Sequence, residues 1–278
     1  SHCRFRPGVE VVARNGETRP WKVGSLNRAT AHLVSTSNGG PAYGGTPDDM
    51  STIEAIRDLK ARGLKVVLYP FVLMDVPEGN TLPAPDGGAT QPVYPWRGRM
   101  TASVAPGLPG TPDGTAAMRS EIDGLCGTTL VSDVVVSGDS VTWAGGDEGY
   151  RRFILHHAAL AIAAGGVDGL VIGSEMIGLT RLRDETGAFP FVEQLIQLAA
   201  DAKAMLGEAA TVTYAADWTE YAGYRPDDGS GDVWFNLDPL WAHPAIGAIG
   251  IDNYMPLSDW RDGDLSVGNP DGAGFAND

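Results

Sequence analysis

Amphipathic segments alternate with apolar runs along much of the chain. Apolar residues recur every three to four positions in residues 150–166 and 189–207, which predicts two helices with one buried face each. An almost continuous apolar run follows each helix, at residues 167–175 and 210–218, and predicts a buried strand. A helix, a glycine and a buried strand in series are typical of parallel α/β units.

The same pattern predicts two further units. Ser51 and Glu54 form a capping box at the start of a helix, and the apolar run 64–74 after that helix predicts a wholly buried strand. A shorter helix at residues 237–247 leads into a strand at residues 248–257. At least four such units in series indicate either a doubly wound sheet or a (β/α)8 barrel.

A long insertion separates the first unit from the next. Residues 75–115 are rich in proline and glycine and are too long for a plain connection, so we expect a functional loop. Residues 115–125 predict a helix, and residues 129–143 predict a small β-hairpin. The expected organisation is one domain over residues 1–278, with a loop and hairpin insertion at about 75–148.

The ends of the predicted strands favour the barrel. No glycine-rich phosphate loop of the GxGxxG or GxxxxGK[ST] type follows any strand. Several strands instead end in polar or aromatic residues, namely Tyr69, Glu175, Asp217, Trp218, Asp252, Asn253 and Tyr254. Catalytic residues of (β/α)8 barrels come from the carboxyl ends of several strands, so these positions are candidates for a site.

The charge balance excludes some partners. Lys and Arg together number 20 and Asp and Glu 35, giving a net charge of −15, which argues against nucleic acid or an anionic lipid surface and is compatible with a neutral polysaccharide. Cys3 and Cys126 make no disulfide framework, and the five histidines show no metal-ligand spacing, so we expect neither metal nor cofactor. Of the adjacent His156 and His157, one is expected to pack and one to be exposed. No run reaches the roughly 18 apolar residues of a membrane helix.

Two strand-end acids have competing interpretations. Glu175 suits the general acid/base of a carbohydrate-cleaving barrel, or else it caps the next helix or pairs with Arg181 or Arg183. Asp217 and Trp218 suit a sugar ring, which would stack on the indole and bond to the carboxylate, or else they are a turn followed by a core tryptophan.

The remaining candidates carry similar alternatives. Asp252 and Tyr254 can orient a substrate or a nucleophile, or they can pack inside the barrel. Tyr94 and Trp96, together with Arg97, can form a sugar platform, or they can be the small core of their own loop. The predicted catalytic residues are Glu175, Asp217 and Asp252, and the predicted substrate-binding residues are Tyr69, Trp96, Ser174, Trp218, Asn253 and Tyr254.

Several long motifs resemble a known family. They include "PVYPWRGRM", "GGVDGLVIGSEMIGLTRLRD", "YAADWTEY" and "GIDNYMPLSDWRDG". They resemble the TIM-barrel-like domain of gene transfer agent and phage tail host-specificity proteins, over nearly the whole chain. The resemblance implies a tail-tip or hub protein of a phage-like particle, made in the bacterial cytoplasm. Its implied partners are polysaccharide or peptidoglycan of the host envelope and other tail or baseplate subunits.

The resemblance also implies a glycoside-hydrolase-like (β/α)8 TIM barrel. In that enzyme clan the acid/base follows strand 4 and the nucleophile follows strand 7. By this likeness "IGSEM" is the strand-4 motif with Glu175 as acid/base, and "DNYMPL" is strand 6, so strand 1 and strands 7 and 8 are expected outside this fragment. Ser174 stands where the clan usually has an asparagine that bonds the sugar 2-hydroxyl. A binding module without catalysis and a structural barrel of the tail hub remain the alternatives.

Overall fold

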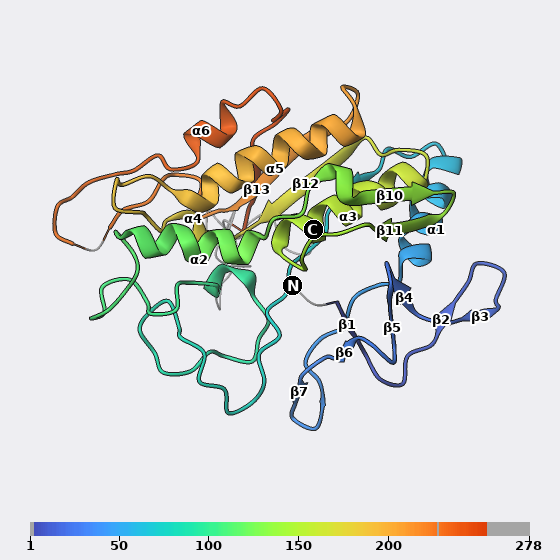
Figure 1. Cartoon of the computed structure of the whole chain (residues 1–278), viewed down its shortest axis with the longest axis horizontal. Helices are drawn as coiled ribbons and strands as arrows, with labels where there is room; N and C mark the ends of the chain where they lie inside the picture. Colours follow the sequence, from blue (N-terminus) through green and yellow to red (C-terminus); the bar gives the residue numbers. More distant parts are fainter. Residues whose placement is uncertain (1–2, 227, 255–278) are drawn as a thin grey trace, which may run out of the picture.

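The computed structural model describes residues 3–226 and 228–254 and has a mixed α/β architecture (Figure 1). A four-stranded sheet with helices packed against it forms the main body, and short two-stranded ribbons made by the N-terminal residues lie to one side. The sheet contains β9 (Val67–Leu68), β12 (Gly169–Ser174), β13 (Thr211–Asp217) and β14 (Gly250–Asp252).

The strands of the sheet lie in the order in which the chain forms them. All three strand pairs are parallel, and the spatial order is β14-β13-β12-β9. A doubly wound sheet would reverse its strand order at a switch point, whereas a barrel adds each new strand beside the last. The described strands show no reversal and do not close into a barrel, so they form an open, sequentially ordered sheet.

The helices largely match the predicted segments. The α-helices are α1 (Asp49–Ala61), α2 (Ala116–Cys126), α3 (Tyr150–Ala163), α4 (Ile177–Thr180), α5 (Pro190–Leu206) and α6 (Asp238–Trp241), and two 3-10 turns, η1 (Arg97–Arg99) and η2 (Val131–Asp133), join them. Pro190 occupies the first turn of α5, and Gly207 ends that helix in a left-handed conformation, as expected. The helix predicted at residues 237–247 is confirmed only as the four-residue α6.

The predicted capping box of α1 is wrong. The N-cap is Asp48, whose Oδ1 accepts a hydrogen bond of 2.9 Å from the Ser51 backbone N–H. Glu54 pairs instead with Arg19, at 2.9 Å between Oε1 and Nη1. Asp48 is as strong an N-cap as a serine, so it starts the helix before Ser51 and places both predicted capping residues inside it.

The wholly buried strand predicted at residues 64–74 is also wrong. The ladder contains only Val67–Leu68, and Leu64 and Phe71 are 53% and 50% exposed. Among the described residues β9 is an edge strand that pairs with β12 alone, and Pro70 has no N–H to extend the ladder. The apolar run therefore supplies an edge and a loop in place of a central strand.

One face of the sheet packs against α3 and α5. Leu68, Leu170 and Val212 pair across β9, β12 and β13 and point to this helical side with Ile172 and Tyr214. Leu170, Ile172, Val212 and Tyr214 are fully buried. Since side chains alternate along a strand, the residues between them face the opposite side, where the strand ends bring polar groups together.

Short ribbons make up the N-terminal region and the hairpin of the insertion. They are β1 (Arg4–Phe5) with β6 (His32–Leu33), β2 (Val11–Val12) with β3 (Thr18–Arg19), β4 (Lys22–Val23) with β5 (Leu26–Asn27), β7 (Thr36–Ser37) with β8 (Gly40–Pro41), and β10 (Val134–Ser137) with β11 (Ser140–Trp143). The predicted hairpin at residues 129–143 is therefore confirmed.

Candidate acid site at the carboxyl ends of the strands

The end of β12 is irregular at the residue that sequence analysis singled out. Val171 pairs with Thr213, but Ser174 pairs with Ala215, so β12 carries one extra residue between these pairs. The next residue, Glu175, has a φ of +50°, in the left-handed region that costs a non-glycine residue of order 1 kcal/mol. Its N–H donates to the Ala215 carbonyl at 2.8 Å, which holds the strained backbone against β13. Bulges re-aim side chains beside functional sites, and this one directs Glu175.

The Glu175 carboxylate is enclosed by the loop that follows β9. Its Oε2 accepts a hydrogen bond of 2.7 Å from Trp96 Nε1 and lies 3.2 Å from Arg97 Nη2. The residue is only 5% exposed. Burial raises the pKa of Glu175 above its ordinary value, and the nearby Asp252 carboxylate raises it further, while Trp96 and Arg97 oppose the shift. The net effect of these surroundings is a pKa above the ordinary value, even with a cation beside the carboxyl group.

Asp252, at the end of β14, lies beside the same guanidinium nitrogen as Glu175. Its Oδ2 accepts a hydrogen bond of 2.5 Å from the Tyr69 hydroxyl and lies 3.7 Å from Arg97 Nη2. Burial and this bond to Asp252 raise the pKa of Tyr69, so the phenol keeps its proton and remains a donor.

Arg97 links the two acids to β12 and to an aromatic pair. Its Nε donates to the Ser174 carbonyl at 2.7 Å and to Ser174 Oγ at 2.6 Å. Its guanidinium carbon lies 4.6 Å from the centre of the Phe71 ring, which stacks on Tyr69 at 4.5 Å. We call Glu175, Asp252, Arg97, Trp96 and Tyr69 the acid site; it joins three strand ends and one loop.

Other predicted site residues lie outside this cluster. The Asp217 carboxylate turns back on its own loop, where Oδ1 accepts from the Thr219 N–H at 2.8 Å and from its hydroxyl at 2.5 Å. Trp218 is 36% exposed, and Asn253 and Tyr254 are exposed beyond β14. The structure thus brings Glu175, Asp252, Tyr69, Trp96 and Ser174 together around Arg97, and it gives Asp217 a turn-forming role.

A second buried acid, Glu220, was not among the predicted residues. It accepts hydrogen bonds from the Thr180 hydroxyl at 2.5 Å, the Tyr214 hydroxyl at 3.0 Å and the Asp217 N–H at 3.0 Å. Tyr214 in turn accepts from the N–H of Met176, the residue after Glu175. The segment Asp217-Trp218-Thr219-Glu220 has the spacing of a capping box, and this is the sequence signal that would have found Glu220.

Glu220 should make stability depend on pH. Burial raises its pKa from 4.5 to about 7. Between these two pH values the folded state binds more protons than the unfolded state. The contribution of Glu220 to the free energy of unfolding is therefore full below pH 4.5 and is lost as the pH rises to 7. In urea unfolding, Glu220→Gln should gain about 3 kcal/mol relative to wild type between pH 4.5 and pH 7.5. A difference that stays constant across this range would contradict the assignment.

The loop that carries Trp96 and Arg97 depends on a glycine in α4. A Cβ on Gly178 would lie 2.1 Å from the Met100 carbonyl oxygen and 2.7 Å from that of Gly98. Gly178→Ala should therefore displace this loop and destabilise the fold by about 1–3 kcal/mol in urea unfolding. Gly124→Ala is the matched helical control, because a Cβ there meets no atom within 4 Å, and it should stabilise by about 0.5–1 kcal/mol. Equal effects of the two changes would refute this packing argument.

In the part of the chain that the structure describes, no three His, Cys, Asp or Glu side chains come together as metal ligands would. No helix within the described ranges has the length and apolar character needed to span a bilayer.

Comparison with known families finds one match. Residues 148–278 match the family model described as the GTA TIM-barrel-like domain, GTA meaning gene transfer agent, which confirms the resemblance over this part of the chain. The matched segment contains Glu175, Asp217 and Asp252 and the strands β12, β13 and β14. A comparison with curated proteins finds no match.

Proposed function

We propose that this chain is the glycoside-hydrolase-like domain of a gene transfer agent particle and acts on polysaccharide or peptidoglycan of the bacterial envelope. The observation that carries the proposal is the pair of acids beside Nη2 of Arg97, of which Glu175 is buried and Asp252 is partly buried. The sheet would be the central part of a (β/α)8 barrel, and the particle's tail-tip or hub would bring the domain to its host and hold it against other tail or baseplate subunits.

The two acids suit different steps of glycosidic bond cleavage. Such a reaction needs one carboxylic acid to protonate the leaving oxygen and a carboxylate that acts as nucleophile or base. Environments that push two acids apart in proton affinity assign those roles. Glu175, with its raised pKa, is the proton donor, and Asp252, which accepts from Tyr69 and faces Arg97, is the carboxylate.

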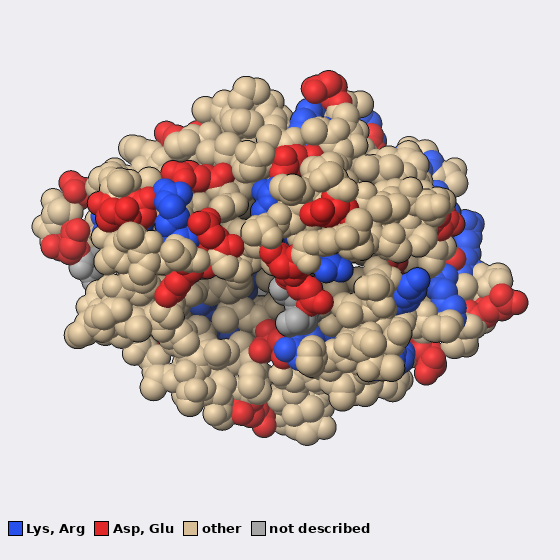
Figure 2. Space-filling view, in the orientation of Figure 1, with Lys and Arg blue, Asp and Glu red and all other residues tan. Residues whose placement is uncertain are grey.

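The surface charge is compatible with a neutral glycan. Figure 2 shows acidic side chains spread over the visible face among uncharged ones, with basic side chains interspersed and gathered mainly near the N-terminal ribbons. With a net charge of −15, the protein would repel polyanions such as nucleic acid and attract no anionic membrane.

A second candidate function is glycan binding without cleavage. Ser174 Oγ, at the position where related enzymes use an asparagine to bond the sugar 2-hydroxyl, is occupied by Arg97 at 2.6 Å. Because Arg97 already holds the Ser174 hydroxyl, this hydroxyl is not free to bond a sugar. Such a site suits a receptor-binding barrel, in which Glu175 and Asp252 contact a sugar without cleaving it, or a structural barrel.

Sugar release from host envelope material separates the two functions. Purified polysaccharide and peptidoglycan would be incubated with the wild-type protein and with Glu175→Gln, and new reducing ends and bound glycan would both be measured. Release by wild type alone supports the hydrolase. Tight binding by both proteins with no new reducing ends would support glycan binding in place of hydrolysis. If the proteins neither release sugar nor bind glycan, a structural role for the barrel is the remaining function.

A further inference from the structure

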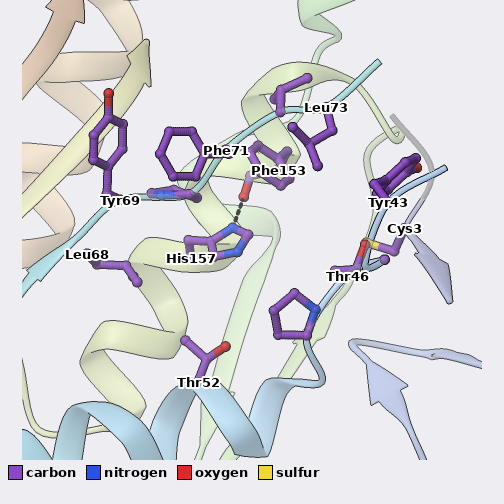
Figure 3. A pocket seen from close by; sticks show the side chains of 14 residues that line it. Cys3, Tyr43, Thr46, Thr52, Leu68, Tyr69, Phe71, Leu73, Phe153 and His157 are labelled. Carbon is purple, nitrogen blue, oxygen red and sulfur yellow. Dashed lines mark hydrogen bonds between the residues drawn. The ribbon is translucent and has the colours of Figure 1, made fainter. Parts of the chain in front are cut away.

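A cavity of about 340 Å³ lies between the segment after β9, helix α3 and the N-terminal residues (Figure 3). Three aromatic side chains line one side of it, Tyr69 and Phe71 from the β9 segment and Phe153 from α3, and Tyr43 from the N-terminal region lies on the other side beside Cys3. Small-molecule sites in proteins usually measure about 300–1,000 Å³, so this cavity has room for one sugar unit and not for a long chain.

The lining of the cavity carries no formal charge among the described residues. Its fourteen residues include no Asp, Glu, Lys or Arg, in a chain where 20% of residues are charged. Two threonines, Thr46 and Thr52, add hydroxyl groups to an otherwise apolar and aromatic wall. A charged ligand would lose its hydration here without a partner, so the lining selects a neutral ligand.

His157 adds one hydrogen-bond acceptor to this wall. Its Nδ1 lies 2.8 Å from the Phe153 carbonyl oxygen, which can only accept, so Nδ1 carries the proton. Burial lowers the pKa of His157 to about 4, so the ring is neutral at pH 7 and Nε2 is an unprotonated acceptor. The sequence pattern predicted that one of the adjacent histidines would be exposed. In fact His156 is buried and His157 is partly buried at the cavity, which Figure 3 shows.

The cavity adjoins the acid site through two shared aromatic residues. Tyr69 lines the cavity and donates its hydroxyl proton to Asp252 at 2.5 Å. Phe71 lines the cavity and lies against the Arg97 guanidinium, which contacts both acids. The cavity and the acid site therefore share a wall made by these two rings, and a ligand seated in the cavity would contact the residues that hold Asp252 and Arg97.

The geometry points to a subsite for the acetamido group of an N-acetylated sugar, with its methyl group among the aromatic rings and its amide N–H donating to His157 Nε2. An acetamido group is neutral and combines a methyl group with one N–H donor and one carbonyl acceptor, which the aromatic wall, His157 Nε2 and the threonine hydroxyls match. The inference rests on the glycan-binding role proposed above and names its substrate class as N-acetylated glycans.

Binding of free N-acetylglucosamine, measured by NMR titration on the wild-type protein, tests this inference without requiring catalysis. Wild type and Glu175→Gln should bind it, while glucosamine, whose ammonium group finds no acidic partner in the cavity, should bind at least tenfold more weakly. His157→Phe, which keeps a ring but removes the acceptor, should weaken N-acetylglucosamine binding about tenfold. His157→Gln, whose side-chain oxygen restores an acceptor, should recover part of that loss.

The outcomes separate this inference from the proposed function. Equal binding of N-acetylglucosamine and glucosamine, or full affinity in a folded His157→Phe, would overturn the subsite, and so would the absence of binding to wild type. If His157→Phe does not fold, the resonances of Phe153 and Phe71 in the wild-type protein decide the question. The subsite requires these resonances to shift when N-acetylglucosamine is added, and unchanged resonances would contradict it. Selective binding of the acetamido sugar without any sugar release would support the subsite and contradict the proposed hydrolase activity.

Discussion

Replacement of Glu175 by glutamine is expected to lower the rate of sugar release by about 10²–10⁴-fold, the usual contribution of a general acid. The amide has the shape of the carboxylic acid and can still accept the Trp96 hydrogen bond, but it cannot donate a proton to a leaving oxygen. Glycan binding should survive, because the change leaves the rings and the polar groups around the site in place. Initial rates of reducing-end formation on envelope glycan measure the effect.

A pH profile adds a signature that a structural role for Glu175 would not produce. An acid must be protonated to act, so activity should fall as the pH rises through the pKa of Glu175, which burial raises above its ordinary value. The residual activity of Glu175→Gln should lack this fall.

An exposed glutamate supplies the matched control for this substitution. Glu193, on α5, is an exposed partner of Arg119, and Glu193→Gln should leave the rate unchanged. If Glu193→Gln and Glu175→Gln lower the rate equally, or if neither lowers it, Glu175 is not the proton donor.

Replacement of Arg97 by methionine is expected to destabilise the fold by about 3–5 kcal/mol, as is found when one partner of a buried ion pair is removed. Arg97 is 7% exposed and contacts both Glu175 and Asp252. Without it, the buried Glu175 and the partly buried Asp252 both lose this cation, and Ser174 loses its donor. Urea unfolding at pH 7 measures the loss.

A double variant shows whether the loss comes from the unpaired acids. Arg97→Met with Glu175→Gln should be more stable than Arg97→Met alone, because the buried acid is then neutral and only the partly buried Asp252 lacks its partner. Arg97→Lys should fall between wild type and Arg97→Met, since it keeps the charge but loses the Nε bonds to Ser174. A cost below about 1 kcal/mol for Arg97→Met would show that the ion pairs do not stabilise the fold, and additive effects of the two changes would show that they are not coupled.

The sequence predicted the parts of the fold that follow from periodicity. The helices α3 and α5 and the strands β12 and β13 lie where their apolar patterns place them, because each buries a face in the main core. The apolar run 64–74 misled because apolar content does not distinguish a central strand from an edge strand with a loop. That distinction depends on which neighbours pair with the strand, and within residues 3–226 and 228–254 Val67–Leu68 pairs with β12 alone.

The candidate site was predicted in part, for a similar reason. Strand ends identified Glu175, Asp252 and Tyr69 as neighbours, since parallel strands deliver their carboxyl ends to one edge of a sheet. The partnership of Trp96 and Arg97 with Glu175 joins residues that are about eighty positions apart, and no local pattern encodes it. Asp217 also lies at the carboxyl end of a strand and was predicted for the same reason. Its carboxylate instead accepts a hydrogen bond from Thr219, two residues later in the chain.

The extra residue in β12 has a consequence for comparing related chains. The direction of Glu175 depends on the number of residues between Val171 and Ser174, and not on their chemical character alone. A gap or insertion placed anywhere in residues 172–174 of an alignment would equate Glu175 with a neighbouring position, Ser174 or the core residue Met176. Relatives that keep the acid should therefore be identified by the spacing from the buried run to the glutamate, even where the intervening residues differ.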